Sequence, residues 1–441
     1  MKIKKGDVKV KVFTEVLINY FQKLNSKLID NRFITDVQMD SKKVTKGSLF
    51  IAINNGNNYV SEALKNGAEL VICDREIEEL KYSNVIKVEN SIQTLQELAK
   101  LYRKKLNLKV IAITGSEGKT TTKDLIHGIL KKKYRVKKTL GNHNNHIGLP
   151  YTILQLSSED EIAVLEMGMS DLGEIDLLSK IAQPDYAVIT NIGDSHLEFL
   201  KNRDNVFKAK TELLKYVDTK RTLLYGDDPY FKTVEGIKVG FDKNNNYIIN
   251  ETKDLYEGMI FTLNEEKYFL PLNGLYNVIN ASFGIALGKM FNMSYTEIKE
   301  ALECIEITGM RFEKIIKDGV LYINDAYNAS PVSMKMALQA FSSLPLNKQK
   351  VVVLADALEL GEKEIEYHIE VLSEALKHNF YRIFIYGERM KKASEILKNE
   401  AIESFDSKNE IKNAIQQIEN VGVLLKGSRG MKLEEIIISK E

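Results

Sequence analysis

The residues most able to do chemistry lie in the stretch "GSEGKTTT", where two glycines, a lysine and three threonines occur close together. An apolar run at residues 110–113 precedes them and is typical of a buried strand. Backbone N–H groups in a glycine-rich turn, together with the start of the next helix, bind phosphate. Lys119 would then reach the terminal phosphates of a nucleotide, and Thr120 would place its hydroxyl on Mg²⁺.

The spacing within this stretch differs from that of an ordinary phosphate loop. Only two residues separate Gly115 from Gly118, whereas the ordinary motif has about four at this place. The alternative is a tight strand-to-helix turn in which Lys119 does no more than cap the helix. Nucleotide binding is the interpretation that the residue types favour.

Two further apolar runs end in residue types that bind metal ions. Glu166 ends the first, at the position where a phosphate-loop fold holds its metal through an acidic residue. The second ends at Asn191, with His196 in the loop beyond. The alternatives are a carboxylate at a helix start, which Glu174 suits better, and a structural histidine. Beside a carboxylate and a Mg²⁺-binding threonine, His196 is predicted to be a ligand.

The elements that must position these residues follow from the pattern of apolar runs. Strands and helices alternate from Lys109 onward, which predicts a parallel sheet covered by helices on both faces. The pattern restarts near Gly309, and the later strands end in polar or glycine residues, as strands do where they line a ligand crevice. A chain of 441 residues suggests about three domains. We therefore predict an α/β fold with domains at residues 1–106, 107–308 and 309–441.

Composition excludes several classes of function. Basic and acidic residues number 62 and 61, which argues against a dominant surface for nucleic acid or membrane. No apolar run approaches the ~18 residues of a membrane span, and the N-terminus lacks the apolar centre of a signal peptide. Cys73 and Cys304 lie in unrelated segments, which fits a reducing compartment. We expect a cytoplasmic monomer without membrane insertion.

With these residues in hand, the sequence resembles the Mur ligase family over nearly its whole length. Members are ATP-dependent enzymes that form amide bonds on the peptide stem of peptidoglycan precursors, and their phosphate loop has the same short spacing. "MDSKKVTKGSLFIAI", with Ser41, resembles the uridine-nucleotide-binding domain at their N-terminus. "LNGLYNVINASFGIAL", with Asn277 and Asn280, resembles the adenine side of the ATP site. "GMRFEK" carries the hinge arginine, Arg311, and "KGSRGMKLEEII" resembles the C-terminal signature.

Three segments resemble those members that add D-alanyl-D-alanine to UDP-N-acetylmuramoyl-tripeptide. They are "GNHNNHIGLP", "INDAYNASPVSM" and "LADALELG". The Asp-Asn-Pro-Arg signature of the diaminopimelate-adding members is absent. The first segment has an alternative interpretation as a zinc site at His143 and His146, but it lacks further carboxylate or cysteine ligands, so a substrate-binding loop is preferred.

The sequence also departs from the family pattern. Lys42 follows Asp40 and Ser41 where an arginine is usual, and the next loop lacks the family's Asp-Gly-His. Ser330 stands where the family usually has asparagine, and Ala355 where glycine is common. These changes concern the uridine side and the surroundings of the incoming dipeptide.

The resemblance implies a mechanism and a set of site residues. ATP phosphorylates the terminal carboxylate of the tripeptide, and the amine of the dipeptide attacks the resulting acyl phosphate. The lysine at position 210, an ordinary helix residue by spacing alone, is commonly carbamylated in the family and would help to bind a second Mg²⁺. The implied residues are catalytic Lys119, His196, Lys210 and Arg311; ATP-binding Gly115, Ser116, Glu117, Gly118, Lys119, Thr120, Thr121, Asn277, Asn280, Arg311 and Asp325; substrate-binding Ser41, Asn142, Asn145, Asn191, Tyr327, Asn328 and Asp356; and Mg²⁺-binding Thr120, Glu166, His196 and Lys210.

The same resemblance assigns the three domains. Residues 1–106 would bind the UDP precursor, residues 107–308 would bind ATP, and residues 309–441 would form a Rossmann-like domain for the dipeptide, drawn inward when ATP binds. Two alternatives remain open. One is a ligase of the same fold with another substrate, such as a folylpolyglutamate synthetase or another Mur enzyme. The other is a nucleotide-dependent regulator without catalysis.

Overall fold

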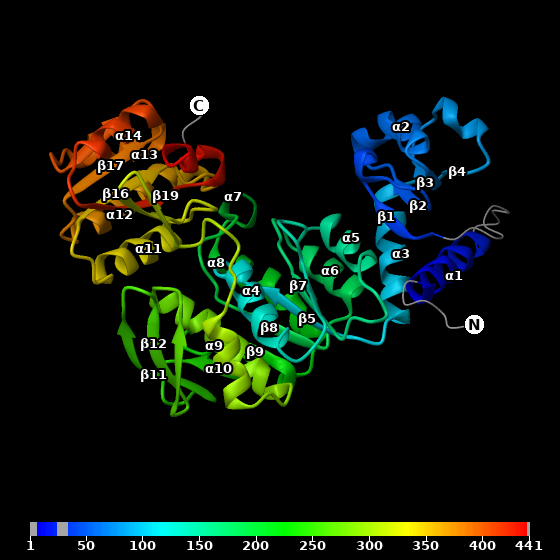
Figure 1. Cartoon of the computed structure of the whole chain (residues 1–441), viewed down its shortest axis with the longest axis horizontal. Helices are drawn as coiled ribbons and strands as arrows, with labels where there is room; N and C mark the ends of the chain where they lie inside the picture. Colours follow the sequence, from blue (N-terminus) through cyan, green and yellow to red (C-terminus); the bar gives the residue numbers. More distant parts are fainter. Residues whose placement is uncertain (1–6, 24–33, 439–441) are drawn as a thin grey trace.

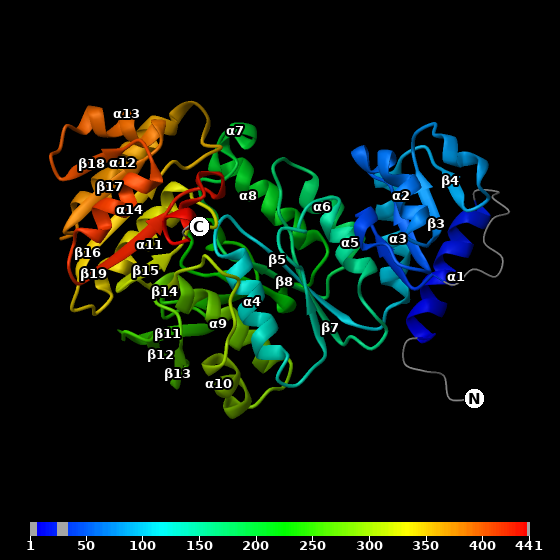
Figure 2. The same cartoon turned by 45° about the horizontal axis from the view of Figure 1, so that its top comes forward.

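Three β-sheets follow one another along the chain, and the sequence prediction of an α/β fold is confirmed. The computed structural model describes residues 7–23 and 34–438. The first and third sheets lie at opposite ends of the central one (Figure 1), and the turned view shows the same order (Figure 2). Among the described residues, no helix combines the length and apolar character that a membrane span requires.

The first sheet has four parallel strands in the order β1-β2-β3-β4. Its strands are short apolar runs, and β2 is buried along its whole length. These strands are β1 (Asp36–Gln38), β2 (Ser48–Ile51), β3 (Ala68–Cys73) and β4 (Val85–Lys87). The accompanying helices are α1 (Asp7–Lys23), α2 (Val60–Lys65) and α3 (Ser91–Lys105).

The central sheet has nine strands in the order β13-β12-β11-β10-β9-β8-β5-β7-β6. They are β5 (Lys109–Thr114), β6 (Val136–Lys138), β7 (Ile162–Glu166), β8 (Tyr186–Ile189), β9 (Thr222–Tyr225), β10 (Ile237–Gly240), β11 (Tyr247–Asp254), β12 (Met259–Leu263) and β13 (Glu266–Leu270). The helices of this region are α4 (Lys119–Leu130), α5 (Gly148–Leu154), α6 (Glu174–Ala182), α7 (Leu197–Leu200), α8 (Arg203–Thr211), α9 (Leu275–Met290) and α10 (Tyr295–Glu303).

Helices cover both faces of the parallel part of this sheet, because its strands carry apolar side chains on either side. Ile111 and Ile113 of β5 join a core with α4, α9 and α10, while Val110 and Ala112 point into a core with α3, α5 and α6. Helix α3 lies in the region expected to form the first domain, yet it contacts α5 and α6. Arg103 of α3 donates a hydrogen bond to the carbonyl of Ala182, at the end of α6, at 2.9 Å. One apolar core therefore runs from the first sheet into the central one.

Strands β11, β12 and β13 extend the central sheet: β11 pairs with β10 in parallel, and the β11–β12 and β12–β13 pairs are antiparallel. The alternating pattern of the sequence did not predict them. They lie beside the third sheet's helix α11 in Figure 1.

The third sheet has six strands in the order β14-β15-β19-β16-β17-β18, parallel except for the β14–β15 pair. They are β14 (Glu313–Lys317), β15 (Val320–Asn324), β16 (Gln349–Ala355), β17 (Arg382–Tyr386), β18 (Ile402–Phe405) and β19 (Val421–Lys426). Its helices are α11 (Pro331–Ser343), α12 (Glu364–Leu376), α13 (Glu388–Leu397) and α14 (Lys408–Gln416).

Candidate active site

The loop between β5 and α4 requires its two glycines. Gly115 and Gly118 have φ angles of +147° and +78°, a region that favours glycine because it lacks Cβ. A Cβ on Gly115 would lie 1.9 Å from the hydroxyl oxygen of Thr190, and one on Gly118 would lie 2.6 Å from Asn280 Oδ1. The loop therefore runs in close contact with Thr190, directly after β8, and with Asn280 in the first half of α9.

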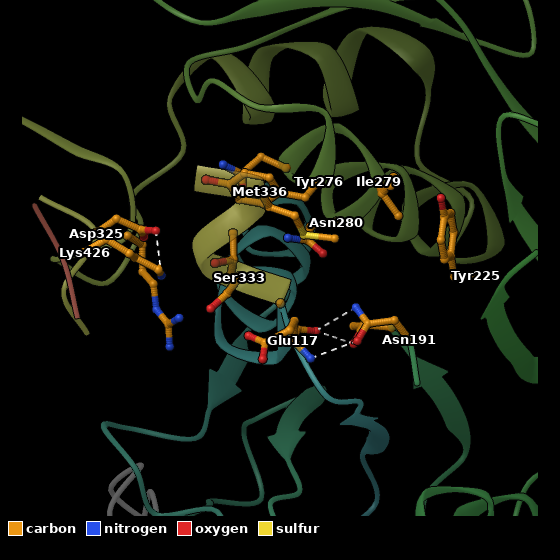
Figure 3. A pocket seen from close by; sticks show the side chains of 15 residues that line it. Glu117, Asn191, Tyr225, Tyr276, Ile279, Asn280, Asp325, Ser333, Met336 and Lys426 are labelled. Atoms are coloured by element: carbon orange, nitrogen blue, oxygen red, sulfur yellow. Dashed lines mark hydrogen bonds and ion pairs between the residues drawn. The ribbon is translucent and has the colours of Figure 1, made fainter. Parts of the chain in front are cut away.

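Asn191, directly beyond β8 and Thr190, holds this loop through hydrogen bonds. Its side-chain oxygen accepts from the Glu117 N–H at 2.9 Å, and its amide donates to the Glu117 carbonyl at 3.2 Å (Figure 3). Its own carbonyl accepts from the Ser116 N–H at 3.0 Å. Asn191 was expected to bind substrate. Here its polar groups shape the phosphate loop.

Lys119 folds back over the loop that precedes it. Its ammonium donates to the carbonyls of Gly115 and Ser116, at 2.7 and 2.9 Å. Burial lowers the pKa of Lys119, Arg311 adds to this effect, and the carboxylates of Glu117 and Glu166 oppose it. The positive charge of this lysine is thus concentrated at the glycine-rich turn.

The expected metal ligands Thr120 and Glu166 are in contact. The Thr120 hydroxyl donates to Glu166 Oε1 at 3.2 Å, and the Asn144 amide donates to the same oxygen at 2.9 Å. Glu166 Oε2 is buried and makes no hydrogen bond among the described residues, although Lys123 lies 3.4 Å from it. Asn144 and Lys123 were not singled out from the sequence. In the sequence, only the closeness of Lys123 to the phosphate-loop stretch and the place of Asn144 within the segment "GNHNNHIGLP" could have suggested them.

This donor set fits Mg²⁺ bound jointly with a nucleotide. A hydroxyl and a carboxylate are hard oxygen ligands of the kind Mg²⁺ prefers, and Mg²⁺ usually takes its other ligands from phosphates and water. Among residues 7–23 and 34–438, no group of three or more His, Cys, Asp or Glu side chains is placed to hold a metal ion. Phosphate oxygens would therefore have to complete the site.

His196 and Lys210 lie near the same charged loop. His196 has a φ of +55°, and burial, followed by the charges of Lys119 and Lys210, lowers its pKa to about 4. The ring is therefore neutral at neutral pH, as a metal ligand must be. Lys210, on α8, is only 1% exposed. Burial and then the charge of Lys119 hold its pKa well below the usual value.

Within the described residues, the Lys210 side chain makes no hydrogen bond and no ion pair. A buried lysine without a partner is costly in its charged form, so it tends to lose its proton. Lys208, two residues earlier on the same helix, is exposed. The contrast between the two lysines follows from the helix face that each occupies.

A cavity of about 110 Å³ adjoins the phosphate loop. It lies between this loop, α9 and the carboxyl ends of β15 and β19, as Figure 3 shows. The expected adenine-side and hinge residues line it, which brings together positions far apart in the sequence. These residues are Asn277, Asn280, Arg311 and Asp325, joined by Thr190, Tyr225, Tyr276, Ser333, Met336 and Lys426, which the sequence did not single out.

Arg311 links the third sheet to the phosphate loop. One guanidinium nitrogen lies 3.4 Å from the Thr120 hydroxyl, and the guanidinium lies 4.2 Å from the ring centroid of Tyr327. Its buried Nε has no hydrogen-bond partner among the described residues. The third domain thus reaches the phosphate loop in this structure.

Asp325 and Lys426 form an ion pair beside the same cavity. Lys426 Nζ lies 2.8 Å from Asp325 Oδ2 and donates to the carbonyl of Asn328 at 3.0 Å. Lys426 is the last residue of β19, and Asp325 directly follows β15. They fix the loop that carries Tyr327 and Asn328.

Most of the other expected substrate residues are engaged within the protein. Ser41 is buried and donates to Glu62 at 2.7 Å. Asn145 accepts from the N–H of Gly148, the first residue of α5, at 2.8 Å. Asp356 accepts from the Met390 N–H at 2.9 Å at the start of α13. Asn142 is exposed in the loop before α5, as are His143 and His146. These residues are not gathered in one place around the phosphate loop.

Comparison with known proteins defines the class of this site. Residues 113–288 match the Mur ligase middle domain, and residues 310–429 match the Mur ligase glutamate ligase domain. The chain belongs to the Mur ligase family, whose members are ATP-dependent amide ligases. The resemblance inferred from the sequence is confirmed, and the chain is an ATP-dependent ligase.

The relatives agree over nearly the full length. The UDP-N-acetylmuramoyl-tripeptide–D-alanyl-D-alanine ligase of Bacillus subtilis (strain 168) is 40% identical over 422 residues, which cover 92% of each chain. A crystal structure of MurF from Acinetobacter baumannii is similar with a TM-score of 0.86 and 27% identity over 97% of each chain. MurF of Thermotoga maritima in complex with ADP gives 0.81 and 28%, covering 91% of this chain and 96% of that one.

Proposed function

We propose that this protein uses ATP to join D-alanyl-D-alanine to UDP-N-acetylmuramoyl-tripeptide, forming ADP and phosphate during peptidoglycan precursor synthesis. The observation that carries this proposal is the 40% identity, over 92% of both chains, to a ligase of that name. The phosphate loop and its neighbouring cavity support it, because they provide a nucleotide site of the required kind.

The proposed reaction has two steps. The terminal carboxylate of the tripeptide attacks the γ-phosphorus of ATP, and ADP leaves. The dipeptide amine then attacks the acyl carbon, and phosphate leaves from the tetrahedral intermediate. Lys119 and the loop amides hold the phosphates, and Arg311 balances charge from the opposite side. Positioning and charge neutralisation therefore supply most of the catalysis.

The metal ligands would be Thr120 and Glu166 for one Mg²⁺, with Glu166, His196 and modified Lys210 for a second. Bound Mg²⁺ would offset the negative charge of the transferred phosphoryl group. The Oε2 of Glu166, which makes no hydrogen bond and lies 3.4 Å from Lys123, supports the first assignment. The second is supported by the neutral ring of His196 at neutral pH.

Lys210 is proposed to carry a carbamate. Its neutral amine would add to CO₂ through a new N–C bond and release one proton, which converts a cation into an anionic ligand. The lowered pKa and the burial of this lysine support that step. Its position near Lys119 would place the new negative charge beside the phosphate loop.

The remaining assignments follow the family pattern. Asn277, Asn280 and Asp325 would hold the nucleotide, while Ser41, Asn142, Asn145, Asn191, Tyr327, Asn328 and Asp356 would serve the two substrates. Domain limits at residues 106 and 308 are proposed on the same ground, although the core shared by α3 and the central sheet blurs the first. A monomer in the cytoplasm, where UDP-linked precursors and ATP occur, is proposed as its state.

A phosphate-release assay tests the function. We expect release only when ATP, UDP-N-acetylmuramoyl-tripeptide and D-alanyl-D-alanine are all present, with the ligated product identified by mass spectrometry. The Lys119→Ala variant is the inactive control. Release with a single free amino acid would instead indicate a relative with another substrate. Absence of release under every condition would favour a regulator.

A further inference from the structure

A second cavity, of about 850 Å³, lies between the central and third domains. The central domain contributes Glu198 of α7 and Lys201 directly after it, and the third domain contributes the consecutive residues 359–363. The reaction centre is close by, because Glu359 Oε2 lies 4.0 Å from His196 Nδ1. The cavity therefore has a place and a size that suit the incoming dipeptide.

Exposed charges of both signs line this cavity, which suits a zwitterionic dipeptide. They are Glu198, Glu359, Glu362, Lys201 and Lys363. Because several exposed side chains of each sign share the lining, no single one of them decides where the dipeptide lies. The placement of the backbone that carries them decides it instead.

Residues 357–363, named here the cavity segment, have a backbone that is unfavourable in isolation. They follow β16 directly after Asp356 and form no regular element before the single 3₁₀ turn Gly361–Lys363. Glu359 has a φ of +64° and Gly361 a φ of +69°. The left-handed conformation is sterically disfavoured at a residue with a Cβ, such as Glu359. Contacts from outside the segment must therefore hold it in place.

His368 of α12 makes one of these contacts. Its ring is 1% exposed, and the Ala357 N–H donates to its Nε2 at 3.0 Å. Because Nε2 accepts, the other nitrogen carries the proton, and Nδ1 donates to the carbonyl of Glu364 at 2.5 Å. Burial lowers the pKa of His368, against the opposing effect of its bond to that carbonyl. The neutral ring thus joins the start of the cavity segment to the start of α12.

Ser428, beyond β19, holds the next residue of the segment. Its hydroxyl accepts from the Leu358 N–H at 2.9 Å, and its own N–H donates to the carbonyl of Asp356 at 3.0 Å. Ala357 and Leu360 bury their side chains in the core of the third domain. His368 and Ser428 are the two side-chain acceptors recorded for N–H groups of the cavity segment within the described residues.

We infer that His368 is a positioning residue that, together with Ser428, holds the cavity segment in the conformation that receives the incoming dipeptide. It does not touch the reacting atoms. Its contribution is to fix the wall before the dipeptide arrives, so that less ordering is required on binding. Loss of the bond to Ala357 should therefore weaken dipeptide binding and spare the formation of the acyl phosphate.

The test compares asparagine and glutamine at position 368. The side-chain oxygen of glutamine can take the place of Nε2, whereas asparagine reaches only the place of Nδ1. His368→Asn therefore leaves the Ala357 N–H without its acceptor, and His368→Gln keeps one. We expect His368→Asn to raise the KM for D-alanyl-D-alanine about tenfold with kcat nearly unchanged. His368→Gln should keep a KM close to that of the unsubstituted protein.

The first reaction step provides an internal reference for this variant. Hydroxylamine captures an acyl phosphate as a hydroxamate, in a reaction that needs ATP and the tripeptide precursor but no dipeptide. His368→Asn should form hydroxamate at nearly the rate of the unsubstituted protein. An equal loss of hydroxamate and ligation would overturn the inference, because it would show a general structural defect.

Val371→Ala is the matched control, because this residue is 1% exposed on the same helix and its truncation weakens the domain core without removing a contact to the cavity segment. Its KM for the dipeptide should stay unchanged. Ser428→Ala removes the acceptor of the Leu358 N–H and should raise that KM as His368→Asn does, which keeps the inference testable if His368→Asn does not fold. A KM that is normal in His368→Asn, or raised equally in Val371→Ala, would overturn the inference.

This inference rests on the proposed function, and the unsubstituted protein separates the two. If the unsubstituted protein forms neither hydroxamate nor ligated product, the proposed function fails and the inference fails with it. If it ligates the dipeptide normally and His368→Asn does so with the same KM, only the role of His368 is wrong.

Discussion

The ammonium of Lys123 lies 3.4 Å from Glu166 Oε2 inside the central domain, where the two side chains are 1% and 4% exposed. Asp124, also buried, is 3.8 Å from the same lysine. It accepts from Lys138 at 2.7 Å and from the Thr308 hydroxyl at 2.7 Å. Thr308 lies just before the segment that enters the third sheet. A buried chain of charges therefore connects a proposed metal ligand to the entrance of the last domain.

The first prediction concerns how much these buried charged residues stabilise the folded protein. Lys123→Met removes the cation and leaves the carboxylates of Glu166 and Asp124 buried with less compensation. The free energy of unfolding should fall by about 3 kcal/mol. Unfolding in urea, followed by circular dichroism, measures it. Lys132→Met is the control, since its pair with Glu300 is exposed to solvent and its loss should leave the free energy of unfolding nearly unchanged. Equal losses in both variants would contradict the role given to Lys123.

A second prediction concerns the metal dependence. Glu166→Ala should raise the Mg²⁺ concentration for half-maximal activity by about tenfold or more, because it removes a ligand proposed for both ions. His196→Ala should raise it less, since that ring would serve one ion. Mg²⁺ titrations of phosphate release at saturating ATP compare the two. An unchanged metal requirement in both variants would return these residues to structural roles.

The third prediction compares two lysines of α8. Lys210→Ala should lose nearly all ligation, because the proposed carbamate ligand disappears. Acetate or formate should restore part of the activity by supplying a carboxylate in its place. Lys208→Ala changes the exposed position and should remain active. Normal turnover by Lys210→Ala, or inactivity of the Lys208 variant instead, would refute the assignment.

A fourth prediction compares two glycines, Gly118 and Gly173, which have positive φ angles and directly precede helices α4 and α6. It distinguishes the effect of backbone strain from the effect of a close side-chain contact. Gly118→Ala and Gly173→Ala should each lose about 1 kcal/mol of stability from the left-handed backbone. At Gly118 the new Cβ would also collide with Asn280, whereas at Gly173 nothing lies within 4 Å. Only Gly118→Ala should therefore raise the Kd for ADP, as calorimetry can measure. Similar nucleotide affinity in both variants would show that the contact with Asn280 is unimportant.

The last prediction concerns acid stability. Burial, followed by the charges of Lys138 and Lys131, lowers the pKa of His127 from 6.5 to about 4. Between these values the unfolded chain binds a proton that the folded protein does not, so stability is full above pH 6.5 and falls as the pH drops toward 4. His127→Gln should reduce that fall. The pH dependence of urea unfolding tests this, with His146→Gln, at an exposed loop position, as the control. An unaltered slope in His127→Gln would contradict it.

The sequence by itself determined the class of fold and the chemistry of the phosphate loop. Apolar runs followed by polar ends are local patterns, and they identified strands such as β5, β7 and β8 together with Lys119, Thr120 and Glu166 beyond or at their ends. Local patterns did not predict the strands β11 to β13, because the burial of these strands depends on contacts with α9 and α10. Full-length similarity then supplied the family, which local patterns could only suggest.

Only the tertiary structure decided which of these residues meet and which are already engaged. Asn191 and Asp356 looked available in the sequence, yet their hydrogen bonds hold a loop and begin a helix. Lys123 could not be singled out from the sequence, because burial and contact between distant segments are not encoded at any single position. Lys208 and Lys210 differ by two places on one helix, but packing encloses only the second. A side chain's charge and reactivity depend on the dielectric and the neighbours that the fold provides.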